Sequence, residues 1–212
     1  MTFFQSFPVP PLPPQPRSTR YVPPPWVAPP AHELPAVVHV GKFLRRGPSI
    51  IVGVKSADVY STGCSFSLSW LFRRVDQNDE DWADLQENFH HSGMGFRHGR
   101  SQQTSLMLGV QFPDGSKAST ANQGPHGLRG AGQDPEPPTL ALNHGGGSGG
   151  DDELSGTGTI WLWPLPPAGE FRLLAQWTAL GMSESSVVVD GAQLREAAAG
   201  TQKYWPEEGT QG

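Results

Sequence analysis

One nine-residue segment, residues 64–72, constrains the fold of this chain more than any other. Its sequence is CSFSLSWLF: every even-numbered position is apolar, and positions 65, 67 and 69 are serine. Successive side chains of a β-strand point to opposite faces, so this period of two predicts a strand with one buried face. The chain is therefore expected to build a sheet that packs one face against a core.

Other segments extend this interpretation to most of the chain. Residues 105–112 repeat the alternation, and the Pro-Asp-Gly turn at 113–115 predicts a hairpin that returns through residues 117–120. Further strands are expected at 36–44, 49–54, 159–163, 170–178 and 186–189.

Two short helices are expected beside these strands. Residues 79–90 place Trp82, Leu85 and Phe89 on one apolar stripe, with acidic residues near the N-terminus, where the helix dipole favours them. Asp190 is a suitable N-cap for a second helix that ends at Gly200.

Glycine and proline divide the chain into parts of different character. The 212 residues include 26 glycines and 22 prolines, which disfavour long helices and coiled coils. Twelve of the prolines lie in residues 1–35, and eleven of the glycines lie in residues 121–158. The expected organisation begins with a disordered proline-rich segment at 1–20 and a proline-rich arm packed on the domain at 21–35. A β-sandwich domain at 36–200 follows, with a C-terminal tail at 201–212. Within this domain we expect a variable segment at 76–104 and a flexible glycine-rich loop at 121–158.

These elements predict an all-β fold. With the variable segment and the glycine-rich loop set aside, enough residues remain for a sandwich of about seven strands, which needs roughly 100 residues. The expected fold is an antiparallel β-sandwich, immunoglobulin-like or jelly-roll in layout, with two short helices and a proline-rich N-terminal arm.

Charge and composition exclude several classes of partner. The net charge of −5 disfavours nucleic acid, and no apolar stretch is long enough to span a membrane. The glycine run at 145–150 is followed by three acidic residues, which would repel phosphate, so no nucleotide is expected. A single cysteine and the lack of a secretory leader pattern predict a cytoplasmic protein without disulfides.

Two groups of sequence motifs resemble a family of uncharacterised bacterial proteins. The first comprises PPPWVAPP at 23–30, ELP at 33–35 and VYSTG at 59–63; the second is WLWPLPPAG at 161–169, followed by Gln176-Trp177. The sequence departs from the family at Cys64, where an aromatic residue is expected. The resemblance implies no activity, cofactor or ligand, and implies only that most of residues 21–205 form one unit.

Residues that could carry chemistry are few. His90, His91 and His98 follow Glu87 closely, and imidazole with carboxylate is a ligand set for zinc or non-haem iron. These four residues are the candidate metal ligands, although their spacing matches no established zinc motif and glycines follow the two adjacent histidines. The alternative is a polar surface segment. Cys64 starts the inward face of its strand, so a buried, unreactive thiol is expected there, and no catalytic residue is assigned.

The strand at 159–163 is unusual because both of its faces are apolar. Trp161 and Trp163 share one face, and Ile160 and Leu162 share the other, while the prolines that follow disfavour a central strand. We expect the segment near a sheet edge, with the proline-rich arm or a partner covering its second face. The candidate partner surface comprises Trp26, Trp161, Trp163, Pro164, Pro166 and Pro167.

The sequence thus favours a non-catalytic interaction or structural module without a cofactor, acting through an apolar edge and long loops on a protein partner or a second copy. The alternative is a metal-binding protein or enzyme that uses the segment containing His90, His91 and His98.

Overall fold

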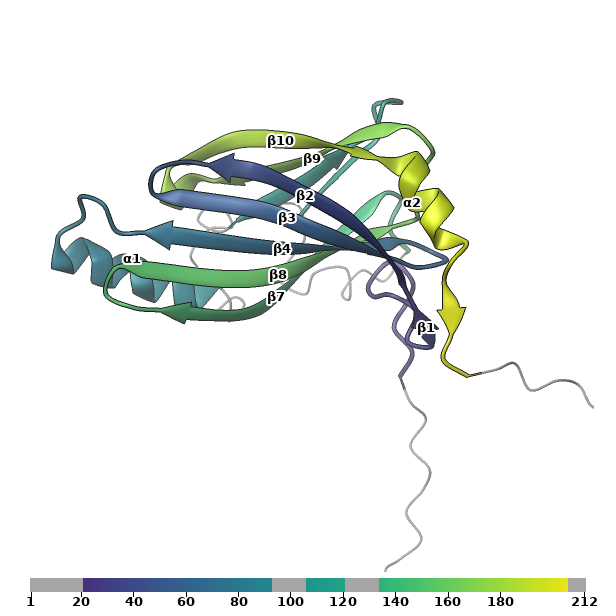
Figure 1. Ribbon diagram of the computed structural model, residues 1–212, viewed down its shortest axis with the longest axis horizontal. Coiled ribbons are helices and arrows are strands. Elements are labelled where there is room, and N and C mark those ends of the chain that lie inside the picture. Colours follow the sequence, from purple (N-terminus) through teal and green to yellow (C-terminus); the bar gives the residue numbers. More distant parts are fainter. Residues whose placement is uncertain (1–20, 93–105, 121–133, 206–212) are drawn as a thin grey trace, which may run out of the picture.

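The fold is an antiparallel β-sandwich, seen in a computed structural model that describes residues 21–92, 106–120 and 134–205 (Figure 1). One sheet has five strands in the order β2-β3-β4-β8-β7, and the other has four in the order β10-β9-β5-β6. The first sheet comprises β2 (Ala36–Arg46), β3 (Ile50–Val59), β4 (Cys64–Arg73), β8 (Glu153–Trp163) and β7 (Thr139–Gly149). The second comprises β10 (Met182–Asp190), β9 (Glu170–Trp177), β5 (Met107–Gln111) and β6 (Lys117–Ser119). The all-β prediction is confirmed, and the choice between an immunoglobulin-like and a jelly-roll layout stays a prediction.

The alternating segment forms β4, at the centre of the five-stranded sheet. Its apolar side chains are buried at every second position from Cys64 to Phe72, and the serines between them face outward. β4 pairs with β3 on one side and with β8 on the other. Because both neighbours satisfy its backbone groups and its apolar face meets the four-stranded sheet, β4 has the environment that its alternation predicts.

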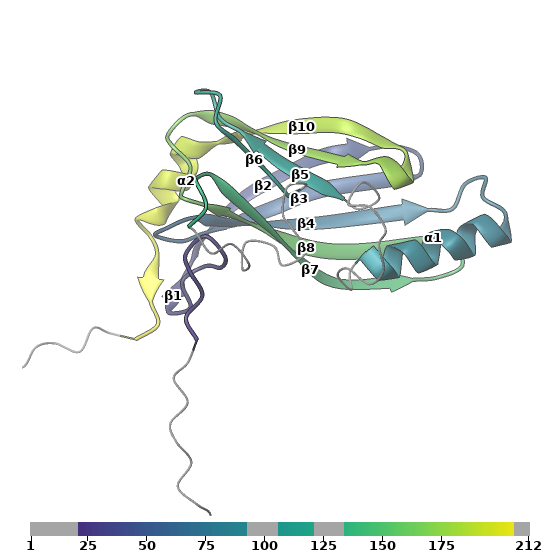
Figure 2. The same ribbon diagram turned by 180° about the vertical axis from the view of Figure 1, so that it is seen from behind.

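Helix α1 (Asp79–Ser92) closes one end of the sandwich. Figure 2 shows it beside β7 and β8, on the side of the five-stranded sheet that carries the second sheet. Trp82 stacks on Phe72 of β4 with ring centres 5.9 Å apart, and Phe89 stacks on Trp177 of β9 at 6.3 Å. The apolar stripe expected from the sequence therefore completes the core where the four-stranded sheet ends.

The glycine-rich segment differs from the prediction. Residues 121–133 lie outside the described residues, but 139–149 and 153–158 belong to β7 and β8, so the loop prediction is wrong for these residues. The reason is steric. A Cβ atom at Gly156 would overlap the indole nitrogen of Trp70 on the neighbouring strand, and one at Gly158 would lie 2.9 Å from the same ring. These glycines leave room for a large side chain in the core and do not mark a flexible loop.

Short elements complete the C-terminal part of the chain. A 3-10 helix (Thr178–Leu180) joins β9 to β10, and α2 (Gly191–Ala198) follows β10. The carboxylate of Asp190 accepts a hydrogen bond from the Ala192 N–H at 2.8 Å, so it caps α2 as predicted. β11 (Gln202–Lys203) then pairs with β1 (Glu33–Leu34). None of the described helices combines the length and apolar character that crossing a membrane requires.

Candidate functional site

The proline-rich arm, residues 21–35, lies against one end of the sandwich, and we call this end the arm end. The indole N–H of Trp161, on β8, donates to the carbonyl oxygen of Pro25 at 2.8 Å. The ring of Trp26 meets the ring of Trp163 edge-on, with centres 6.0 Å apart, and Val27 is buried. The arm therefore covers the second apolar face of β8, which is one strand in from the sheet edge.

The Trp161 ring is enclosed from other directions as well. Tyr60, at the end of β3, meets it edge-on at 5.7 Å. Gly63 lies so close that an added Cβ atom would be 2.7 Å from the ring and 2.5 Å from the Leu162 carbonyl oxygen. Together these contacts leave the Trp161 side chain with no exposed surface. Glycine at position 63 leaves room for the ring, and the arm covers it.

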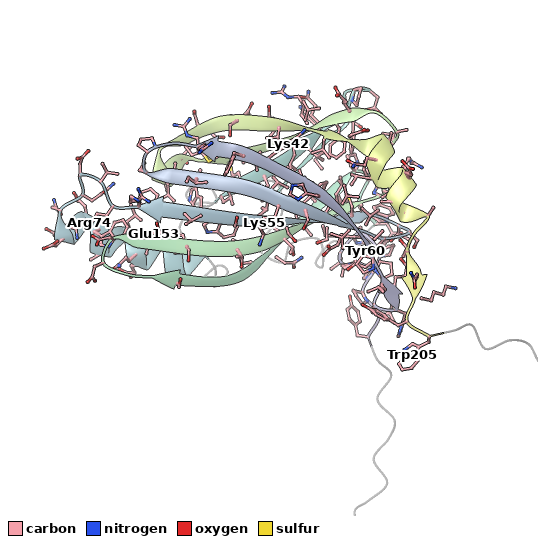
Figure 3. All side chains as sticks on the ribbon, viewed as in Figure 1. Lys42, Lys55, Tyr60, Arg74, Glu153 and Trp205 are labelled. Carbon is pink, nitrogen blue, oxygen red and sulfur yellow. The ribbon has the colours of Figure 1, made fainter. Side chains whose placement is uncertain are left out.

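Polar contacts fix the rest of the arm. The Glu33 carboxylate accepts hydrogen bonds from the N–H of Ser61 at 3.0 Å and from its hydroxyl at 2.6 Å. β1 pairs with β11, and the N–H of Tyr204 donates to the carbonyl oxygen of His32 at 2.9 Å. The arm, the β3–β4 turn and the C-terminal strand are thus joined, and Figure 3 shows Tyr60 and Trp205 in this part of the molecule.

Large apolar side chains remain exposed at the arm end. Trp205 is 71% exposed and Tyr204 is 56% exposed, and both directly follow β11. Leu34, in the strand β1 that pairs with β11, is exposed as well. We call these three residues the aromatic patch. A local concentration of exposed apolar side chains on a folded domain is typical of an interaction surface.

A cleft of about 170 Å³ opens beside the covered tryptophans. Proline and phenylalanine rings make up most of its wall, and the β5–β6 turn contributes the polar groups. It is lined by Phe112, Asp114, Ser116, Pro137, Pro138, Pro164, Leu165, Pro166 and Pro167. We call it the proline cleft.

The predicted partner-surface residues separate into two sets. Trp161 is fully buried, so its side chain is not available to a partner and the prediction is wrong for this residue. Pro166 is buried apart from the surface that it gives to the lining of the proline cleft. Trp26 and Trp163 are half-buried against each other. Pro164 and Pro167 are exposed and line the proline cleft.

The structure brings together no metal site among the residues it describes. Glu87 is exposed on α1, which also includes His90 and His91. The side chains of those two histidines and the whole of His98 lie outside the described residues. Within the described ranges, no three side chains of histidine, cysteine, aspartate or glutamate are arranged to hold a metal ion.

Cys64 has the environment expected of a structural thiol. Its side chain has no exposed surface, and burial raises the pKa of the thiol well above its ordinary value. A protonated, inaccessible sulfur is a poor nucleophile. Its role is to fill space at the start of β4.

Two parts of the arm end were not found from the sequence. The proline cleft combines segments around residues 112–116, 137–138 and 164–167, which only the fold brings together. The sequence does contain a signal for the exposed pair Tyr204-Trp205. These two aromatic residues follow the last predicted helix and have no apolar neighbours in the sequence, so no strand or helix pattern assigns them to the core.

Comparison of the chain with protein-family models, with curated proteins and with solved structures gives no match.

Proposed function

We propose that this chain is a non-catalytic protein-binding module and that its partner contacts the arm end. The observation that carries the proposal is the aromatic patch, where Trp205 and Tyr204 extend from a backbone that is held by pairing with the arm. Exposed tryptophan and tyrosine are enriched at the centres of protein interfaces. A rigid base lowers the entropy lost when such side chains are buried by a partner.

The chemistry of the described residues supports binding over catalysis. Cys64 is buried, and the described ranges hold no cluster of metal-ligating side chains. The proline cleft is lined mainly by apolar rings, and among its lining residues Asp114 is the one with a titratable side chain. A cytoplasmic location is part of the proposal, since one cysteine allows no intrachain disulfide.

Site-specific photo-cross-linking tests the proposal. A photoreactive phenylalanine analogue replaces Trp205 in the full chain, and a matched variant carries it at Val75, which is 52% exposed. Val75 follows Arg74, which Figure 3 labels at the opposite end of the molecule. We expect a discrete protein adduct from position 205 and none from position 75 in cells that express the chain naturally.

The adduct's mass identifies the partner, and a mass of two chains would identify a second copy. Identical adducts from positions 205 and 75, or no adduct from position 205, would contradict the proposal.

A further inference from the structure

One wall of the proline cleft has a fixed shape because hydrogen bonds hold the segment that forms it. The N–H of Leu165 donates to the Thr62 carbonyl oxygen at 2.9 Å, and the Arg195 side chain donates from Nε to the Pro166 carbonyl oxygen at 2.8 Å. At the end of the segment, the N–H of Gly191 donates to the Gly169 carbonyl oxygen at 2.8 Å. A ligand would therefore find the wall already formed.

The size of the cleft limits what it can hold. Pockets for drug-sized molecules measure roughly 300–1,000 Å³, and this cleft measures about 170 Å³. It has room for one side chain or a molecule of similar size. The five proline rings and Phe112 offer that side chain an apolar lining, and the proline nitrogens carry no N–H that would be left unpaired beneath it.

The carboxylate of Asp114 lies at the mouth of the cleft. The Oδ1 atom of Asp114 accepts hydrogen bonds from the Ser116 hydroxyl at 2.6 Å and from the Ser116 N–H at 2.9 Å. These bonds, the hydroxyl's first, lower the pKa of Asp114, so the carboxylate is charged at neutral pH. Within the described part of the chain, no cation forms an ion pair with Asp114.

We infer that the proline cleft binds an arginine side chain presented by the protein partner. Arginine combines a three-carbon stem, which suits the apolar wall, with a cation that is more weakly hydrated than an ammonium group and that donates to a carboxylate. Asp114 would accept through Oδ2, while Ser116 keeps Oδ1 in place. The inference rests on the proposed function, since it names one group of the partner that meets the arm end.

The test is an amide-shift titration of the full, ¹⁵N-labelled chain with N-acetylarginine N-methylamide. The matched ligand is N-acetylcitrulline N-methylamide, which has nearly the same shape without the charge. We expect the arginine ligand to shift the amides of Phe112, Ser116 and Leu165 with a millimolar Kd, and the citrulline ligand to bind more weakly.

Two variants separate charge from shape. Asp114→Asn keeps the acceptor oxygen for Ser116 and removes the charge, so it should weaken arginine binding about twofold to fivefold, the range of an exposed ion pair. It should leave citrulline binding unchanged. Asp151→Asn, at the far turn between β7 and β8, should leave both unchanged.

Three results would overturn the inference: equal binding of the two ligands, no effect of Asp114→Asn on arginine binding, or no shift of these amides by the arginine ligand at about 50 mM. These results are separate from the cross-linking result at Trp205. Cross-linking at position 205 without arginine binding would support the proposed function and contradict the inference about the cleft. Arginine binding without cross-linking would contradict the proposed function.

Discussion

Replacing Trp161 with phenylalanine should destabilise the chain by an amount that depends on the arm. The substitution removes the N–H that donates to Pro25, a hydrogen bond worth about 1 kcal/mol. It also removes two buried ring carbons, at about 0.8 kcal/mol each. The expected loss in the free energy of unfolding is therefore about 2–3 kcal/mol in the full chain.

The same substitution in a chain that lacks residues 1–28 should cost less than about 1 kcal/mol, because the acceptor is gone and the ring is already partly solvated. Urea unfolding followed by far-UV circular dichroism measures both values, with the m-value checked for constancy. Leu68→Ala is the control, since Leu68 is buried in the middle of β4 and should cost the same in both backgrounds. An equal cost of Trp161→Phe with and without the arm would refute the proposed contact.

Three further predictions concern the sandwich itself. Gly156→Ala should lower the free energy of unfolding by about 1–3 kcal/mol because its methyl group overlaps Trp70, whereas Gly146→Ala, which meets open space, should change it by less than about 0.5 kcal/mol in the same urea titration. The Cys64 thiol should react with a disulfide reagent at the rate of global unfolding, and fast reaction of the native chain would show that it is accessible. Asp190→Ala should cost about 1 kcal/mol by removing the N-cap of α2, while Asp190→Ser should retain most of that stability; equal losses in thermal unfolding would mean that capping is not the cause.

The sequence predicts the strands well where a single periodicity dominates. β4 alternates without interruption, and the structure buries each position that the pattern selects, from Cys64 to Phe72. The hairpin from β5 to β6 follows in the same way from the Pro-Asp-Gly turn, with Gly109 opposite Ser119. In both cases the information lies within about ten neighbouring residues.

The glycine-rich strands could not be predicted in this way. Glycine usually marks turns and loops, and Gly156 and Gly158 are strand residues because the Trp70 ring on β4 occupies the space beside them. That space is defined by a residue more than eighty positions earlier in the chain. The same limit applies to the proline cleft, whose three segments come together only in the folded sandwich.

The tryptophans of the arm end show which features of a surface the apolar pattern of the sequence predicts and which it does not. Apolar residues on both faces of the segment 159–163 correctly indicate that something covers the second face. The pattern does not say which residue remains exposed after that cover is in place. In the structure the arm buries Trp161, and Trp205 is the exposed tryptophan at the same end of the molecule.

Hydrogen exchange of the tryptophan indole N–H groups tests this arrangement most directly. A chain labelled with ¹⁵N at tryptophan gives one indole resonance for each of its seven tryptophans, assigned by single substitutions. After transfer to D₂O, we expect the Trp161 resonance to persist, since its N–H is buried and donates to the Pro25 carbonyl oxygen, and the Trp205 resonance to disappear at once. Immediate loss of both resonances would show that the arm does not cover β8, and protection of both would show that the aromatic patch is not open to a partner.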